Sequence, residues 1–214
     1  MCTTNDQNST PKSTTYDPNK WIYIPSFNAN ADHSKAPRYV LGTRGQKPLI
    51  CICENPSTAV PDDLDKTLKR ISTYVEQSDR YDSWIVLNLY PYRAKNPEDL
   101  PKEMDNRLHQ SNLKAIEFVL SQFDQPDLWL AWGGDIMKTN RQYLIECVRD
   151  FISLADAFQP QYRCAQTTAD GHPRHPSRLS DPITLDRFNM NEYRTQISRI
   201  LAHRARRDTH RTTN

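Results

Sequence analysis

The fold is decided by residues 48–75, which read PLICICENPSTAVPDDLDKTLKRISTYV. Residues 48–53 form a short, continuous apolar run, and such a run is typical of a strand that is buried on both faces of a sheet. The segment after it carries apolar side chains at helical spacing, namely Leu64, Leu68, Ile71 and Val75. A buried strand followed by a helix is one half of a parallel β–α–β unit.

The same alternation continues along the chain. Apolar runs at residues 84–89 and 127–132 predict two more strands, and residues 113–123 and 144–155 carry helical patterns after them. A fourth strand is expected at residues 162–165, after the last of these helices. We therefore predict an α/β fold, a three-layer α/β/α sandwich around a mostly parallel, four-stranded sheet.

The ends of the chain differ from its middle. Residues 1–20 contain no Ile, Leu, Val or Phe, so they cannot bury enough apolar surface to offset the entropy of ordering, and we predict a flexible polar leader. Residues 21–190 are then a single α/β domain, which suits a chain of 214 residues. Residues 191–214 combine apolar side chains at helical spacing with many arginines, which predicts a C-terminal helix and a basic tail.

Composition limits the classes of function. The chain has 28 Lys and Arg against 26 Asp and Glu, so its net charge of +2 creates no overall basic field, and any binding to nucleic acid must use a local patch. Five cysteines with no C-x-x-C spacing argue against a disulfide framework. The apolar runs are far shorter than the roughly 20 residues of a membrane-spanning helix. We expect a monomeric cytoplasmic protein with no membrane association.

Four polar segments follow the predicted strands. Because ligands of open α/β sheets bind beyond the carboxyl ends of the strands, these segments are where function should show. We expect them to converge on one rim of the sheet: residues 54–58 (ENPST), 88–93 (NLYPYR), 133–135 (GGD) and 171–180 (GHPRHPSRLS).

Common cofactor and metal motifs are absent. The sequence has no G-x-G-x-x-G, no G-x-x-x-x-G-K-[ST] and no G-x-S-x-G. His172 and His175 are three residues apart, but neighbouring prolines keep this segment extended, so the two side chains do not share a helical face. We predict no metal and no cofactor. An acidic trio either begins a helix or holds a hard cation: Asp62, Asp63 and Asp65.

Three residues are candidates for chemistry. His175 lies between prolines at the expected rim, where a ring nitrogen can donate a hydrogen bond to a developing oxyanion. Asn55 ends a buried strand, where its amide could position a water or simply close a turn. Asn88 interrupts an apolar strand, where a polar side chain needs partners. Each residue also has a purely structural interpretation.

The order of these segments resembles the uracil-DNA glycosylase superfamily over roughly residues 38–185. The resemblance depends on Asn55-Pro56, Asn88-Leu89 with Arg93, Trp132-Gly133 and residues 175–180 (HPSRLS). A closer resemblance is to family 1643 of the domains of unknown function. It covers residues 38–41, 55–59, 88–93, 131–133 and 171–176.

The glycosylase resemblance implies roles for individual residues. Asn55 would position the attacking water, Asn88 would contact the base edge, and His175 would stabilise negative charge on the departing base. Leu179 would fill the gap left by a flipped nucleotide. Ser57, Gly133, Ser177 and Arg178 would bind phosphates. We further expect Tyr90 to stack on the base, and Pro56 and Arg93 to contact the substrate.

The resulting hypothesis is a metal-independent, nucleobase-directed enzyme of glycosylase-like fold that hydrolyses an N-glycosidic bond in DNA or in a nucleotide. Asn55 cannot itself take a proton from the attacking water, because an amide cannot act as a general base. The alternative is a non-catalytic nucleic-acid-binding or nucleotide-sensing module on the same scaffold, which the basic C-terminal segment favours.

Overall fold

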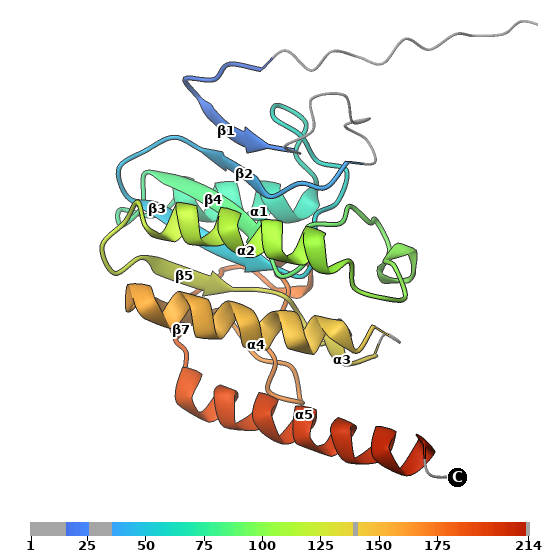
Figure 1. Cartoon of the computed structure of the whole chain (residues 1–214). Helices are drawn as coiled ribbons and strands as arrows, with labels where there is room; N and C mark the ends of the chain where they lie inside the picture. Colours follow the sequence, from blue (N-terminus) through green and yellow to red (C-terminus); the bar gives the residue numbers. More distant parts are fainter. Residues whose placement is uncertain (1–15, 26–35, 139–140, 213–214) are drawn as a thin grey trace, which may run out of the picture.

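The computed structural model describes residues 16–25, 36–138 and 141–212. Most of the predicted leader, residues 1–15, lies outside this described part. One sheet of seven strands, in the order β1-β2-β4-β3-β5-β6-β7, runs through the molecule (Figure 1). The strands are β1 (Trp21–Ile24), β2 (Val40–Thr43), β3 (Pro48–Cys53), β4 (Ser83–Asn88), β5 (Asp127–Leu130), β6 (Gln161–Cys164) and β7 (Asp186–Arg187).

The sheet is wider than the sequence predicts. Its four central strands, β4, β3, β5 and β6, pair in parallel and are the four that the apolar runs indicate. The prediction of a four-stranded sheet was nevertheless wrong, because β1, β2 and β7 add antiparallel pairs at the two sides. β1 is mostly half-buried, β2 contains Gly42 and Thr43, and β7 has only two residues, both exposed, so none of them carries the continuous apolar run of β3.

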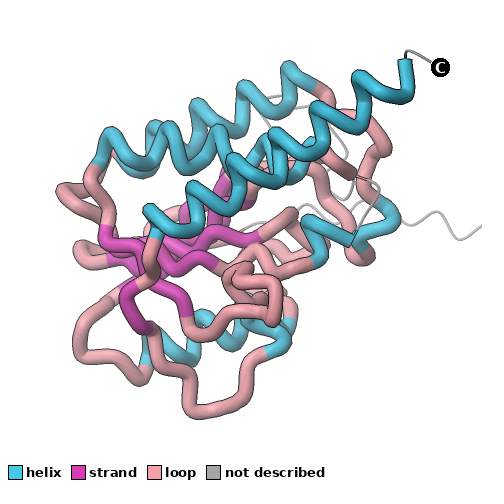
Figure 2. The backbone as a smooth tube through the Cα atoms, turned by 90° about the horizontal axis from the view of Figure 1, so that it is seen from below, coloured by secondary structure: helices cyan, strands magenta, loops and turns pink. Residues whose placement is uncertain are grey.

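Helices cover both faces of the sheet. α1 lies on one face, while α2, α4 and α5 lie on the other, and Figure 2 shows the strands between these two layers. The helices are α1 (Lys66–Glu76), α2 (Asn106–Leu120), the short α3 (Asp135–Lys138), α4 (Tyr143–Ala155) and α5 (Met190–Thr212). No helix in the described ranges is both long and apolar enough to cross a membrane.

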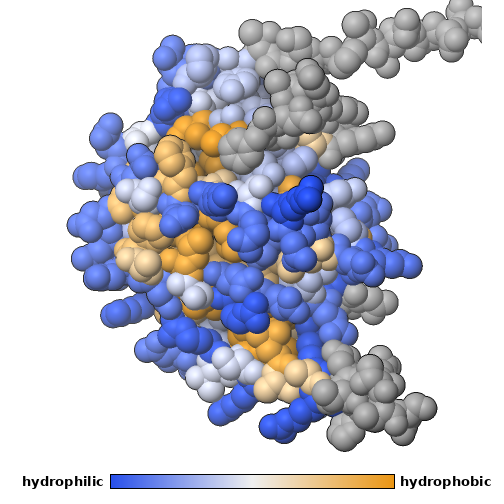
Figure 3. Space-filling model, viewed as in Figure 1, coloured by the Kyte–Doolittle hydropathy of each residue, from blue (hydrophilic) through white to orange (hydrophobic). Residues whose placement is uncertain are grey.

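Two apolar cores hold these layers together. On the α1 face, Leu68 and Ile71 pack against the sheet beside Trp84. On the other face, Ile116 of α2 and Phe151 of α4 belong to a larger core. Figure 3 shows that polar side chains dominate this outer surface, with apolar patches between them.

The C-terminal segment is helical as far as Thr212, so the structure has helix through most of the segment predicted as a tail. Its first turns dock on the larger core through Tyr193 and Ile197, which are buried. The later turns carry exposed residues such as His203 and Arg206. The apolar spacing that predicts docking therefore ends well before the helix does.

Two aspartates of the acidic trio before α1 bind different partners. Asp65 is the N-cap, and its Oδ1 accepts a hydrogen bond of 2.9 Å from the backbone N–H of Leu68. Asp62 accepts a hydrogen bond of 3.1 Å from Trp21 Nε1 and forms an ion pair with Lys20. Of the acidic trio, Asp65 therefore begins the helix, and α1 starts directly after it.

Candidate functional site

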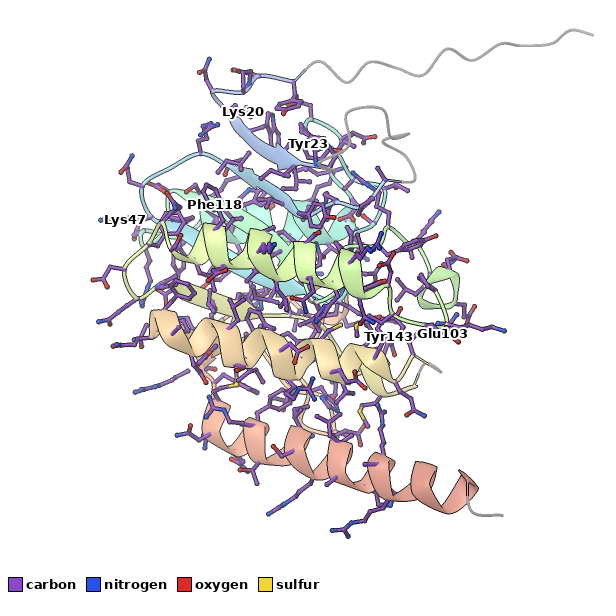
Figure 4. The ribbon with its side chains drawn as sticks, viewed as in Figure 1. Lys20, Tyr23, Lys47, Glu103, Phe118 and Tyr143 are labelled. Carbon is purple, nitrogen blue, oxygen red and sulfur yellow. The ribbon has the colours of Figure 1, made fainter. Side chains whose placement is uncertain are left out.

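A cavity of about 690 Å³ lies at the carboxyl ends of the central strands. Its walls come from all four segments that follow those strands, as the sequence predicts. Lys47 directly precedes β3, whose last residue, Cys53, lines the cavity, so Lys47 lies at the end of this strand away from the cavity. Figure 4 shows Lys47 at the opposite end of the sheet from Tyr143. The predicted site residues that line the cavity are Asn55, Ser57, Asn88, Gly133, His175, Ser177 and Arg178.

Asn88 places a buried polar side chain at the cavity wall. It ends β4, its side chain is fully buried, and neither Oδ1 nor Nδ2 has a hydrogen-bond partner among the described residues. A buried polar group without a partner costs about 1–3 kcal/mol, so such groups need an explanation. Nδ2 of Asn112 donates to the backbone carbonyl of Asn88 at 2.8 Å and holds the strand end in place. The Asn88 amide is thus held at the cavity wall with a free donor and a free acceptor.

Glu54 is a cavity residue that the sequence reasoning missed as a candidate. It directly follows β3, it is buried, and its Oε1 has no hydrogen-bond partner in the described part of the chain. Burial, and then the nearby charge of Asp135, raise the pKa of Glu54 to about 7. A carboxyl group with this pKa exchanges protons readily at neutral pH, as a general base or acid must. The available signal was a charged residue at the end of a buried strand.

His175 is fixed by its own loop. Its Nδ1 accepts a hydrogen bond from the backbone N–H of Ser177 at 3.3 Å and lies 2.9 Å from Ser177 Oγ, which leaves Nε2 for other partners. The N–H of Gly133 donates to the carbonyl of Pro173 at 2.8 Å and ties this loop to the end of β5. Gly133 has a φ of 82°, and a Cβ there would lie 3.4 Å from that of His175.

Cys53 lies beside His175 on the same cavity wall. Hydrogen bonds from Cys51 and then from His175 lower the pKa of the Cys53 thiol to about 6, although burial opposes this. For His175, burial opposes protonation, but the contact with Cys53 and the charges of Glu54 and Asp65 outweigh it, so its pKa is raised. The sequence reasoning missed this pair because Cys53 belongs to a strand.

Cations surround the mouth of the cavity. Lys66, Lys95 and Arg178 are exposed, while Arg174 is half-buried, and all four line the cavity. None of these four side chains forms an ion pair within the described ranges. Arg38 adds a buried guanidinium deeper in the cavity. The rim therefore attracts an anionic group.

The acidic groups nearby offset this charge in part. Asp65 is occupied by its cap, and its Oδ2 accepts a hydrogen bond from the Ser57 hydroxyl. Asp135 and Glu54 also line the cavity, and Glu54 is partly protonated at neutral pH because of its raised pKa. The interior of the cavity thus carries both positive and negative groups, whereas its mouth carries positive charge.

Four predicted site residues lie away from the cavity lining, and two of them serve the core. Tyr90 is fully buried against Tyr143, and its hydroxyl accepts a hydrogen bond from the N–H of Asp105 at 3.0 Å. Leu179 is buried in the core on the α1 face. The stacking role of Tyr90 and the wedge role of Leu179 stay predictions that this placement does not support.

The other two residues organise loops. The Arg93 guanidinium donates to the backbone carbonyls of Ala36 and Ser57 at 3.0 and 2.9 Å and to the Tyr23 hydroxyl at 2.7 Å. Pro56 is buried, and its carbonyl accepts a hydrogen bond from the N–H of Ala94 at 2.9 Å. Arg93 therefore supports the cavity wall from behind, and a direct substrate contact stays a prediction.

The described residues contain no cluster of metal-ligating side chains. No three His, Cys, Asp or Glu side chains come together as a metal site would need in residues 16–25, 36–138 and 141–212. His172 is buried, and its Nδ1 lies 2.8 Å from the hydroxyl of Tyr193 in the core on the α5 side. The histidine pair of the sequence is thus divided between the core and the cavity.

Comparison with known proteins identifies the family. Residues 38–177 match the family described as Protein of unknown function (DUF1643). The chain belongs to this family. The matched segment of this DUF1643 protein begins at Arg38 and ends at Ser177, two residues that both line the cavity. No curated protein and no solved structure matches the chain, so the glycosylase resemblance stays a prediction.

Proposed function

We propose that the cavity binds a nucleobase and that the protein hydrolyses the N-glycosidic bond that joins this base to its sugar. The observation that carries the proposal is the Asn88 side chain, which is fully buried at the cavity wall with both amide atoms unpartnered in the described residues. An amide presents a donor beside an acceptor. This pattern complements a base edge on which a carbonyl lies next to a ring N–H, as in uracil, thymine, hypoxanthine and guanine.

The reaction needs a base for water and a donor for the leaving group. Oxygen of a water molecule forms a bond to the anomeric carbon, and the bond from that carbon to the base nitrogen breaks with its electron pair. The Glu54 carboxylate takes the proton of the water, which its pKa of about 7 allows at neutral pH. His175 donates a hydrogen bond from Nε2 to the base as negative charge develops there.

Asn55 supports this chemistry without acting as a base. Its Nδ2 donates to the carbonyls of Pro56 and Ala94 at 3.1 and 3.0 Å, which fixes the amide and leaves its oxygen to hold the water. Glu54, the preceding residue, supplies the proton acceptor that an asparagine lacks. The two neighbours thus divide positioning and proton transfer between them.

The cationic mouth favours a phosphorylated substrate. Lys66, Lys95, Arg174 and Arg178 line the cavity, and Arg38 lies deeper within it. Arg and Lys at a cavity mouth attract phosphate oxygens, and Arg can bind them in a bidentate manner. A nucleotide, or a nucleotide unit of a DNA strand with its base in the cavity, satisfies both the rim and Asn88.

The proposal is tested by measuring released base. The protein is incubated with nucleoside 5′-monophosphates and with single-stranded oligonucleotides that contain uracil or hypoxanthine, and free base is measured by liquid chromatography. We expect release by the wild type and loss of release in Glu54→Gln. Binding without release by the wild type would favour the non-catalytic module instead. Neither binding nor release, from a protein with a wild-type circular dichroism spectrum, would overturn both.

A further inference from the structure

One nucleophilic group of the cavity has no part in the proposed hydrolysis. Cys53 ends β3 and lines the cavity, although only 4% of its surface is exposed. A thiol is a weak nucleophile until it loses its proton, so what surrounds the sulfur decides whether it reacts. The contacts of Cys53 therefore matter more than its small exposed area.

Three groups favour the thiolate form of Cys53. Cys51 is two residues away on the same strand, so both sulfurs lie on one face, and the two Sγ atoms are 3.9 Å apart. The His175 ring lines the same cavity and interacts with the Cys53 side chain, and the Arg38 guanidinium adds a positive charge nearby. Together they lower the pKa of Cys53 to about 6, whereas burial holds the pKa of Cys51 above its ordinary value. Cys53 thus has both a partner for its negative charge and a path to the cavity.

We propose that Cys53 is a covalent modification site, and that its Sγ attacks small soft electrophiles that enter the cavity while the His175 ring pairs with the thiolate. With an alkyl halide, the sulfur lone pair forms the S–C bond, the C–halogen bond breaks, and halide leaves with its electron pair. The thiol proton leaves to solvent before the attack, and the Nε2–H of His175 faces the thiolate that remains. The alkyl group on the sulfur then occupies part of the cavity beside His175.

Two other cysteines provide internal controls. Cys164 ends β6 with a similar exposed fraction of 7%, but burial and then Asp186 raise its pKa to about 11, and it does not line the cavity. Cys147 is fully buried in α4, and burial raises its pKa above the ordinary range. If burial alone governed reactivity, Cys53 and Cys164 would react alike. If the cavity and His175 govern it, they differ.

The experiment is alkylation of the full chain by iodoacetamide at pH 7, followed over time by mass spectrometry of the tryptic peptides. We expect Cys53 to be alkylated at least about tenfold faster than Cys164, because an ordinary thiol is mostly protonated at this pH. Cys147 stays unmodified as long as the protein is folded, so its peptide reports any unfolding in the same sample. Equal rates at Cys53 and Cys164, or alkylation of Cys53 only together with Cys147, would overturn the proposal.

A variant tests the partner of the thiolate. His175→Asn removes the ring that pairs with the sulfur, and we expect the alkylation rate of Cys53 to fall about tenfold while that of Cys164 stays the same. An unchanged rate at Cys53 would contradict the assigned role of His175. No substrate is present in either experiment. The two proposals share the His175 ring, but alkylation and base release are measured separately, so either can fail while the other stands.

Discussion

Two regions of the molecule each hold a cysteine, a histidine and a carboxylate, and they differ in what surrounds those groups. The cavity group consists of Cys53, Glu54 and His175. The helix group lies between α2 and α4 and consists of His109, Cys147 and Asp150. In the helix group His109 uses both ring nitrogens, with Nε2 at 3.0 Å from Asp150 Oδ2 and Nδ1 at 3.6 Å from Cys147 Sγ.

The comparison shows that residue types alone do not make a site. In the helix group every polar side chain has a partner, and burial raises the pKa of the Cys147 thiol, which keeps it protonated. In the cavity group, Glu54 Oε1 is buried without a partner among the described residues, and the pKa of Cys53 is lowered. Satisfied groups stabilise a fold, whereas unsatisfied groups beside a cavity are available to a ligand.

The largest expected effect separates the two groups by activity. Glu54→Gln removes the proton acceptor, and we expect the rate of base release to fall by about 10²–10⁴-fold. The matched change Asp150→Asn in the helix group leaves the rate of the folded protein unchanged. Both rates are measured by chromatography of free base. A Glu54→Gln variant that keeps more than a tenth of the wild-type rate would contradict the assigned role.

The next effect is a pH dependence that belongs to the cavity group. Because the folded-state pKa of Glu54 is about 7 and its ordinary value is 4.5, its contribution to stability is complete below about pH 4.5. That contribution is lost as the pH rises through 7, and it amounts to about 3 kcal/mol. Gln carries no charge at either pH. Raising the pH from 4.5 to 8 should therefore lower the free energy of unfolding of the wild type by about 3 kcal/mol more than that of Glu54→Gln. Urea denaturation at pH 4.5 and at pH 8 measures it, and a constant difference between the two proteins would refute it.

For stability, in contrast to activity, we expect the larger effect from a change in the helix group. His109→Ala leaves Asp150 and Cys147 without their partner and opens a gap between helices, so we expect the free energy of unfolding to fall by about 2–3 kcal/mol. His175→Ala in the cavity group should cost at most about 1 kcal/mol, since its ring already borders open space. Urea denaturation at pH 7 compares the two variants. A larger loss for His175→Ala would reverse the distinction.

The smallest expected effect concerns the cationic mouth. Replacing Lys95 and Arg178 together by Ala should raise the KM for a nucleoside 5′-monophosphate about tenfold, because exposed charges contribute about 0–1 kcal/mol each. The value of kcat should stay the same, since neither residue touches the reacting atoms. Lys47→Ala, at the other end of the sheet, is the control and should change neither constant (Figure 4). An equal effect of Lys47→Ala would show that general charge, and not the rim, is responsible.

Sequence patterns predicted the centre of the fold better than its sides. Apolar runs indicate β3, β4 and β5 because these strands are buried on both faces, whereas β6, at the side of the parallel part, is largely half-buried. β7 has two exposed residues and no such signal. The convergence of the four polar segments follows from parallel topology alone, which is why Asn88 and His175 could be placed at one cavity from the sequence.

The pairing of side chains could not be predicted in this way. Cys53 and His175 are far apart in the chain, and nothing in their sequence context shows which cysteine each histidine contacts. Tyr90 follows a buried strand and Leu179 matches a position of a motif, yet both side chains are buried in the core. Whether a residue at a strand end faces the cavity or the core depends on packing, and local sequence does not record it.

The central claim is that the Asn88 amide, which has no hydrogen-bond partner in the described part of the chain, binds a ligand. The ligand-induced shift in Tm tests this claim most directly. Thermal unfolding is measured with and without saturating nucleoside 5′-monophosphates, for the wild type and for Asn88→Leu. We predict that a monophosphate whose base has a carbonyl beside a ring N–H raises the Tm of the wild type and not that of Asn88→Leu, whose own Tm is no lower than the wild-type value. An equal shift in both proteins, or no shift in the wild type with any monophosphate, would contradict the account.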